Sequence, residues 1–436
     1  MTTGLAPVDA SGGSAGVSPI PRLAIFTSHP IQYQAPYFRA LAATDRVHPT
    51  VFFGSRHGLD VSLDAGFGTA FQWDVPLLDG YDHVFVANVA WRPDVSRFTG
   101  VRTAGLPDAL RRGRFDALLV LGWQTAAHVQ AIRAAWSLGL PLAIRGESTL
   151  QRTAAVGEGD GRGGTALARR LLWIPVRQRL YRAAFDRVSA FLVIGTRNRD
   201  YYRAFGVSDD KCYWAPYGVD NGWFSLAEPA RSRAREQVRR LIGVGDETVV
   251  FASSAKLIAR KRPGDLVDAV ALTRSEGVAA HALFIGDGEE RSQLERRAAE
   301  LGVAGAITIA GFVNQAEIPA WYAAADALVL PSDARETWGL VVNEAMAAGL
   351  PVVVSDAVGC SPDLVRDAVN GFTYPCGDVD ALADRLARVA ALGATGRRAF
   401  GERSRGIVER FGVDVAAAAT ASAVEAIVAP TTGRRP

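Results

Sequence analysis

The chain has 436 residues, of which 49% are hydrophobic and 21% charged, and its formal net charge is +3. This length allows two domains with separate cores, and the composition is that of a globular protein. The small net charge argues against nucleic acid as a partner, because nucleic-acid binding usually needs a concentrated basic face.

The first half of the chain alternates short apolar strands with amphipathic helices. Residues 1–20 are rich in Gly, Ser, Ala and Pro without the order of a secretion signal, so we expect a disordered leader there. Strand-like runs follow at 23–27, 50–53, 117–121, 141–144 and 190–194, with helix candidates at 35–43, 126–137 and 173–184. The alternation predicts a doubly wound parallel sheet in a first domain, residues 21–224.

A second series of the same kind begins near Thr248. Its strands are expected at 249–253, 282–285, 307–310, 327–330 and 352–355, and its helices at 263–275, 289–301 and 318–324. We expect a linker at 225–246, which contains Pro229 and a charged helical stretch, and a second domain at 247–412. An Ala-rich helix at 413–428 ends the series. The fold class predicted is α/β, with two Rossmann-like domains that face each other across a cleft.

One strand-loop-helix-strand unit, residues 325–355, carries the strongest functional signal. Glu336 falls in the polar loop, and Glu344 falls one to two turns into the following helix. Ligands of such sheets sit at the carboxyl ends of the strands, so both carboxylates can meet parts of one ligand. The unpaired amides of a helix start suit a phosphate or sugar oxygen, and they belong to Thr337, Trp338, Gly339 and Leu340. The alternative is that both glutamates are solvated surface charges.

This unit resembles the donor-site signature of family 4 glycosyltransferases, which are retaining enzymes with the GT-B fold. The segments around the two glutamates that carry the resemblance are 338–340, 343–347, 349–353 and 355–356, all in register. The resemblance is strong over 249–371 and moderate over the first domain. It implies that Glu336 holds sugar hydroxyls and that Glu344 holds the ribose of a nucleotide-diphosphate sugar. It also implies that the terminal helix packs back on the first domain.

Two lysines follow the first strand of the second domain and suit a diphosphate. The family usually has Arg and then Lys at the spacing of Lys256 and Lys261, so Lys256 departs from the pattern and gives up the planar, two-pronged geometry of Arg. The alternative is a basic surface turn. Gly286, in a Gly-Asp-Gly turn after the next strand, resembles a ligand-approaching loop of the family or is a plain turn. Phe312 and Val313 border the nucleotide base if the resemblance holds, and are core or edge residues otherwise.

In the first domain the resemblance is looser. Ser28 and His29 replace the paired-glycine loop of many relatives and are expected to line the cleft, with a structural role for His29 as the alternative. Arg145 and Glu147 stand near the place where several relatives have a sugar-contacting histidine. Trp123 is either a wall for the acceptor or a packing residue. We assign Ser28, Trp123, Arg145 and Glu147 to the acceptor, and His29 to the reaction together with Glu336 and the two lysines.

The function predicted is transfer of a sugar from a nucleotide-diphosphate sugar to an acceptor hydroxyl with retention of configuration. The acceptor is a sugar, a lipid-linked molecule or a small molecule, and the donor is a co-substrate, so no cofactor is expected. No Asp-x-Asp pair stands in a convincing loop, and we expect no catalytic metal. The alternatives are another GT-B enzyme, namely a sugar epimerase or phosphorylase, and a non-catalytic nucleotide-sugar-binding protein.

The sequence also bears on location. Its three cysteines, Cys212, Cys360 and Cys376, are far apart and odd in number, which favours reduced thiols in the cytoplasm. The sequence contains no uncharged apolar run of about 18 residues, so we expect no membrane-spanning helix. The Arg-rich stretch 173–187 allows a peripheral contact with the inner membrane face, but an ordinary amphipathic helix is the favoured interpretation.

Overall fold

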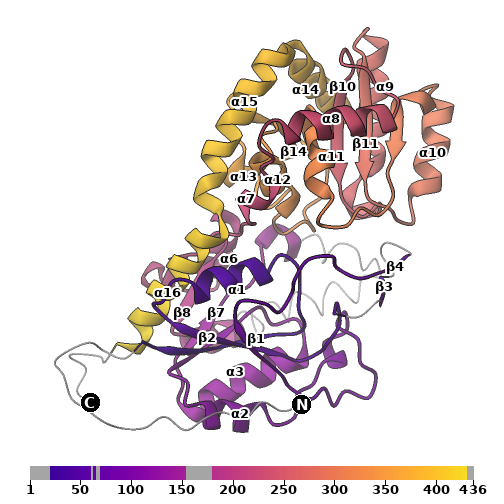
Figure 1. Ribbon diagram of the computed structural model, residues 1–436. Coiled ribbons are helices and arrows are strands. Elements are labelled where there is room, and N and C mark those ends of the chain that lie inside the picture. Colours follow the sequence, from indigo (N-terminus) through magenta and orange to yellow (C-terminus); the bar gives the residue numbers. More distant parts are fainter. Residues whose placement is uncertain (1–19, 60–61, 65–68, 154–178, 430–436) are drawn as a thin grey trace, which may run out of the picture.

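A computed structural model describes residues 20–59, 62–64, 69–153 and 179–429 of the chain. It consists of two α/β units, one above the other, with the C-terminal helices running along one side of both (Figure 1). The leader expected at 1–20 lies outside the described residues except for Ile20, and so do residues 173–178 of the Arg-rich stretch 173–187. Within the described part, no helix combines the length and apolar character needed to cross a membrane.

The first unit is built on a seven-stranded parallel sheet with the order β5-β2-β1-β6-β7-β8-β9. The strands are β1 (Arg22–Thr27), β2 (His48–Phe53), β5 (Asp82–Phe85), β6 (Ala117–Val120), β7 (Leu142–Ile144), β8 (Ala190–Val193) and β9 (Cys212–Trp214). The helices of this unit include α1 (Ala35–Ala42), α2 (Leu106–Gly113), α3 (Ala126–Leu138) and α6 (Thr196–Ala204). The central strands are buried on both faces, which explains their continuous apolar sequences.

The second unit has a six-stranded parallel sheet with the order β12-β11-β10-β13-β14-β15. Its strands are β10 (Val249–Ser254), β11 (Ala280–Ile285), β12 (Ile307–Ile309), β13 (Ala327–Leu330), β14 (Val352–Ser355) and β15 (Gly371–Tyr374). Its helices include α9 (Pro263–Ser275), α10 (Arg291–Glu300), α11 (Ile318–Ala324), α12 (Leu340–Ala347), α13 (Ser361–Leu364) and α14 (Val379–Ala391). The strand order reverses between β10 and β13, and ligands of open α/β sheets bind in the crevice at such a switch point.

The strands predicted from apolar runs are present, with boundaries shifted by one or two residues. Five further strands were not predicted, namely β5, β9, β15 and the antiparallel pair β3 (Ser62–Asp64) and β4 (Thr69–Phe71). β5 is a largely exposed edge strand and β9 has three residues, so neither carries the apolar run that marks a buried strand.

Most of the stretch expected as a linker is a helix of the second unit. Residues 230–241 form α8 (Ala230–Leu241), which packs against α11. Arg235 and Arg239 of this helix pair with Asp326, which stands directly before β13. The charged run therefore anchors α8 to the sheet. The sequence could not reveal this, because the acidic partner lies far along the chain.

The last two helices connect the units. α15 (Gly393–Val408) lies on the second unit, and α16 (Val413–Val428) lies against α1, β8 and β9 of the first unit. The Tyr37 hydroxyl is 2.9 Å from the Thr420 hydroxyl, and Arg46 Nε donates to Glu425 at 3.0 Å. Small alanines on the buried face of α16 let the helix approach the sheet closely. The first unit is therefore built from two separate parts of the chain, its N-terminal half and α16.

Candidate active site

A cavity of about 680 Å³ lies between the two units at the carboxyl ends of the second sheet. Both units contribute to its lining. Eight residues predicted for the site are among those that line it: Glu147, Lys261, Glu336, Thr337, Trp338, Gly339, Leu340 and Glu344. The cavity has the size and the interdomain position usual for a small-molecule site.

Glu336 and Lys261 meet at the switch point of the second sheet. Lys261 lies in a short 3₁₀ turn (Ala259–Lys261) after β10, and Glu336 lies in the loop after β13. Because these strands are neighbours, the following loops converge, and the Lys261 ammonium forms an ion pair with Glu336. Both side chains are only 13% exposed. Arg260 Nη1 adds a second contact to the same carboxylate at 3.3 Å.

The start of α12 presents backbone donors to the cavity. Gly339 precedes the helix with φ of 97°, and a Cβ there would come within 2.8 Å of the Leu330 side chain. No side chain caps this helix start, and Leu340 and Val341 of the first turn line the cavity. The first amides of a helix have no partner within the helix, so this end suits an anion or a hydroxyl oxygen.

Glu344 lies one turn further along α12, on the same side as Leu340. Its carboxylate accepts a hydrogen bond of 2.8 Å from the Tyr322 hydroxyl of α11. Burial raises the pKa of Glu344 from 4.5 to about 7, although the bond from Tyr322 and the charge of Lys261 act in the opposite direction. Glu344 therefore exchanges a proton in the neutral range.

The side chain of Trp338, whose backbone amide was predicted to face the ligand, has a structural role. It lies at the cavity, but its indole is 3% exposed and donates from Nε1 to Asn343 at 2.8 Å. Asn343 in turn donates to the backbone oxygen of Tyr217 in the first unit at 3.2 Å. The indole thus fixes the loop and connects the units, and little of it is left to contact a ligand.

The wall of the cavity in the first unit is built from aromatic and charged side chains. Tyr217 donates to Glu147 at 2.6 Å, and the ring of Tyr33 meets that of Tyr217 edge-on at 5.8 Å. Arg145 is buried behind this wall, stacks on Tyr37 and Tyr217, and donates to the oxygen of Pro216 at 3.0 Å. Arg145, predicted for the acceptor, therefore supports the wall from within.

Ser28, His29 and Trp123 lie outside the lining of this cavity. The Ser28 hydroxyl is 2.8 Å from His29 Nδ1, and the His29 ring packs edge-on against His57. Burial, together with the nearby His57 and His128, lowers the pKa of His29 to about 4, so the ring is neutral near pH 7. Trp123 packs in the core of the first unit against Phe185, Tyr201 and Tyr202. These contacts are those of a packing residue, which the sequence left open as the alternative role of Trp123.

Lys256, Gly286, Phe312 and Val313 also lie outside the lining. A Cβ at Gly286, whose φ is 151°, would come within 2.0 Å of the Ala255 oxygen, so close backbone approach requires glycine there. Val313 packs on the core of the second unit. The Phe312 ring lies 6.4 Å from that of Trp73 in the first unit. Phe312 thus belongs to a contact that closes one side of the cleft.

Several lining residues were not predicted from the sequence. They include Tyr33, Arg152, Tyr217, Trp223, Arg260 and Arg335. Arg260 stands next to Lys261 and could have been included on that ground. No local pattern distinguishes the others from packing or surface residues. Within the described ranges, no group of three His, Cys, Asp or Glu residues could hold a metal ion.

Residues 234–406 match the family model described as glycosyl transferases group 1. This range makes up most of the second unit. The match begins inside α8, the helix that packs against α11 of the second unit. The sequence prediction of a glycosyltransferase family is therefore confirmed for this unit.

Curated relatives match about half of the chain. It is 34% identical over 254 residues to a D-inositol 3-phosphate glycosyltransferase of Xylanimonas cellulosilytica, covering 56% of this chain and 58% of the relative. It is 32% identical over 239 residues to a GDP-mannose-dependent alpha-(1-6)-phosphatidylinositol monomannoside mannosyltransferase of Mycobacterium tuberculosis, covering 51% and 60%. The chain thus spans less than two thirds of the length of these relatives.

Solved structures match both units together. HepE of Anabaena, in complex with UDP and glucose, superposes with a TM-score of 0.67 at 19% identity, covering 93% of this chain and 100% of that protein. Sucrose-phosphate synthase from Thermosynechococcus elongatus gives a TM-score of 0.65 at 19% identity, covering 92% and 98%. The predicted GT-B fold, with two Rossmann-like units, is confirmed.

Proposed function

We propose that the protein is a retaining glycosyltransferase of family 4 that moves a sugar from a nucleotide-diphosphate sugar to an acceptor hydroxyl. One observation carries the proposal: Glu336, Glu344, Lys261 and the uncapped start of α12 line a single cavity. A nucleotide sugar offers a matching set of groups, namely sugar hydroxyls, ribose hydroxyls and a diphosphate. The relatives act on related molecules, since one is named for GDP-mannose and another is bound to UDP and glucose.

The second unit holds the donor in this proposal. Transfer builds positive charge at the anomeric carbon and negative charge on the departing diphosphate. Lys261 and the first amides of α12 stabilise that leaving group, and such preorganised donors supply a large part of the rate enhancement in comparable sites. Glu336 accepts hydrogen bonds from sugar hydroxyls, and its ion pair with Lys261 fixes both side chains before the donor arrives. Lys256, which follows β10, is proposed to add positive charge near the phosphates.

Glu344 receives the ribose. Its carboxylate lies one turn into α12 and lines the same cavity as the start of that helix, so it can meet a part of the donor beyond the diphosphate. When ionised, the carboxylate can accept hydrogen bonds from two neighbouring ribose hydroxyls. Tyr322 holds the other side of the carboxylate in place.

The first unit receives the acceptor at the wall formed by Tyr33, Glu147 and Tyr217. Aromatic faces suit the apolar face of a sugar ring, and Glu147 can orient an acceptor hydroxyl. The named relatives suggest inositol-containing acceptors, either free or attached to lipid. A lipid acceptor would require peripheral contact with the inner membrane face, and we propose a cytoplasmic location with reduced cysteines. We also propose that the transfer needs neither a metal nor a cofactor.

Transfer assays with a panel of donors and acceptors test the function. UDP-glucose and GDP-mannose serve as donors, and D-inositol 3-phosphate and phosphatidylinositol monomannoside as acceptors, with chelator present. We expect product only with a matching pair, and loss of about 10²–10³-fold in rate for Glu336→Gln. Glu276→Gln, which changes an exposed carboxylate at the end of α9, is the matched control and should keep full rate.

The same assays separate the competing functions. Epimerised sugar nucleotide, or product formed only with inorganic phosphate, would contradict a transferase. Donor binding without turnover over the whole panel would favour a binding protein. Retention is tested by the anomeric coupling constant of the product in an NMR spectrum.

A further inference from the structure

A second cavity, of about 560 Å³, lies at the amino-terminal ends of strands in the second sheet. It borders Asp326 and Pro351, the residues directly before β13 and β14, whereas the donor cavity lies where these strands end. α12 runs between the two, from Gly339 at the donor cavity to Gly349 at this one. The two cavities are therefore separate.

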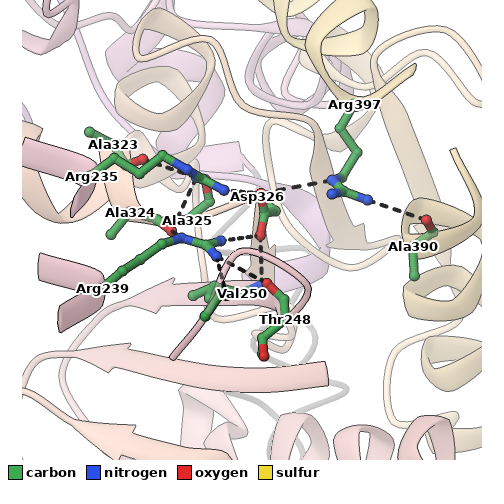
Figure 2. A network of polar contacts seen from close by, with 11 residues as sticks. Arg235, Arg239, Thr248, Val250, Ala323, Ala324, Ala325, Asp326, Ala390 and Arg397 are labelled. Carbon is green, nitrogen blue, oxygen red and sulfur yellow. Dashed lines mark hydrogen bonds and ion pairs between the residues drawn. The ribbon is translucent and has the colours of Figure 1, made fainter. Parts of the chain in front are cut away.

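Arginines dominate the walls of this second cavity, which we call the arginine cavity. Arg231 and Arg235 come from α8, and Arg397, Arg398 and Arg405 come from α15. Three of the five have structural partners. Arg235 and Arg397 approach Asp326, as Figure 2 shows, and Arg405 donates to backbone oxygens at the end of α12.

Asp326 cannot neutralise the remaining positive charge. Its carboxylate already receives Arg235 at 2.9 Å and the buried Arg239, with Arg397 at 3.8 Å (Figure 2). It also accepts the backbone N–H of Val250 at 2.8 Å. Both of its oxygens are thus in use, and the Nε of Arg397 is buried without a hydrogen-bond partner among the described residues.

Two arginines of the cavity remain available. Within the described part of the chain, neither Arg231 nor Arg398 has a hydrogen-bonded or ion-paired side-chain partner. Burial and the charges of neighbouring arginines, chiefly Arg405, lower the pKa of Arg231, although the charge of Glu228 acts in the opposite direction. A half-buried guanidinium crowded by others of the same charge is stabilised by an added anion.

The carboxylates at the cavity do not fill this role. Besides Asp326, they are Glu228, Asp246 and Glu402, and all three are exposed, where water and salt screen them. Glu228 is also engaged at the start of α8, where it accepts from the Ser232 hydroxyl at 2.7 Å. The arginine cavity therefore brings together two guanidinium groups without a hydrogen-bonded or ion-paired partner among the described residues, those of the half-buried Arg231 and the exposed Arg398.

We propose that the arginine cavity binds a small anion with at least two negative charges, of the pyrophosphate or phosphorylated-metabolite class. Guanidinium groups hold phosphate oxygens through paired, charge-assisted hydrogen bonds, which makes Arg the preferred residue for such ligands. Arg231 and Arg398 approach from different helices, so one phosphate group can bridge α8 and α15. The site is independent of the proposed transfer reaction.

Isothermal titration of the full chain with inorganic pyrophosphate tests the proposal. The variants are Arg231→Gln and Arg398→Gln, singly and together, and the exposed Arg398 can be replaced without disturbing the packed interior. Arg233→Gln, an exposed arginine two positions along α8, is the matched control. We expect each single variant to weaken binding by about tenfold and the control to bind as the natural protein does.

Lys261→Ala separates this site from the donor cavity, which can also take a diphosphate. We expect one class of pyrophosphate binding to persist in Lys261→Ala and to disappear in the Arg231→Gln/Arg398→Gln double variant. Binding lost entirely in Lys261→Ala and unchanged in the double variant would overturn the proposal. Equal weakening by Arg233→Gln would reduce the effect to general surface charge, and an absence of heat at millimolar pyrophosphate at two well-separated temperatures would overturn the proposal.

Discussion

The proton on Glu344 should control donor binding. The pKa of this carboxyl is about 7, so it is about one tenth ionised at about pH 6 and about nine tenths ionised at about pH 8. If only the carboxylate accepts the ribose hydroxyls, the apparent dissociation constant scales with the inverse of the ionised fraction. Donor affinity should then rise about tenfold between those two pH values.

Rising pH changes the stability of the fold in the opposite direction to donor affinity, as far as Glu344 contributes to each. The folded-state pKa of Glu344 lies above its usual 4.5, so its contribution to stability is fully present below that value and is lost as pH rises through about 7. The melting temperature without donor should therefore lose this contribution with rising pH. The increase in melting temperature that the donor produces should grow over the same range.

Calorimetric titration with an intact nucleotide sugar is the appropriate assay, since a free terminal phosphate would itself titrate near pH 6. Glu344→Gln should bind the donor more weakly at high pH and with an affinity independent of pH. Tyr322→Phe removes a hydrogen bond that lowers the pKa of Glu344. The midpoint of the pH dependence of donor affinity should therefore move to higher pH in this variant. The three histidines whose pKa is shifted all titrate at about 4, outside this window. An unchanged pH profile in Glu344→Gln would refute the reasoning.

Three further predictions concern single residues. Lys261→Ala should reduce the transfer rate by about 10²–10³-fold at saturating donor, measured by product formation, because the proposed leaving group loses a cation that stabilises it. Gly339→Ala places a side chain at φ of 97° and within 2.8 Å of Leu330, so thermal unfolding should show a loss of about 1–3 kcal/mol, and an unshifted melt would contradict it. Asp326→Ala leaves Arg239, whose side chain is 4% exposed, without its acidic partner, and urea unfolding should show a loss of about 3–5 kcal/mol.

Local sequence predicted much of the second unit and its site. Apolar runs marked β10, β11, β13 and β14, because strands covered on both faces need continuous apolar sequence. The sequence also placed three charged residues at the carboxyl ends of the strands, namely Lys261, Glu336 and Glu344. Each follows the end of a strand, and neighbouring parallel strands end on the same side of the sheet. The family of this unit followed from the same short segments.

The first-unit wall was harder to predict because its residues come from distant segments. Tyr33 follows β1, Glu147 follows β7, and Tyr217 follows β9, and no pattern in any one segment shows that they meet. The aromatic Trp123 follows β6 in a similar way, yet it turns into the core. A side chain at the end of a strand can face either the cleft or the core, and only packing decides between them.

The sequence by itself determined the alternation of strands and helices, the two α/β units and three charged residues that line the cavity, Lys261, Glu336 and Glu344. Those features depend on residues near one another in the chain, where periodicity and helix-end chemistry act directly. Tertiary structure alone decided which tyrosines face the cavity, which arginines Asp326 neutralises, and how far burial shifts the pKa of Glu344. Desolvation and ion pairing depend on neighbours brought together from distant parts of the chain, so the order of residues does not specify them locally.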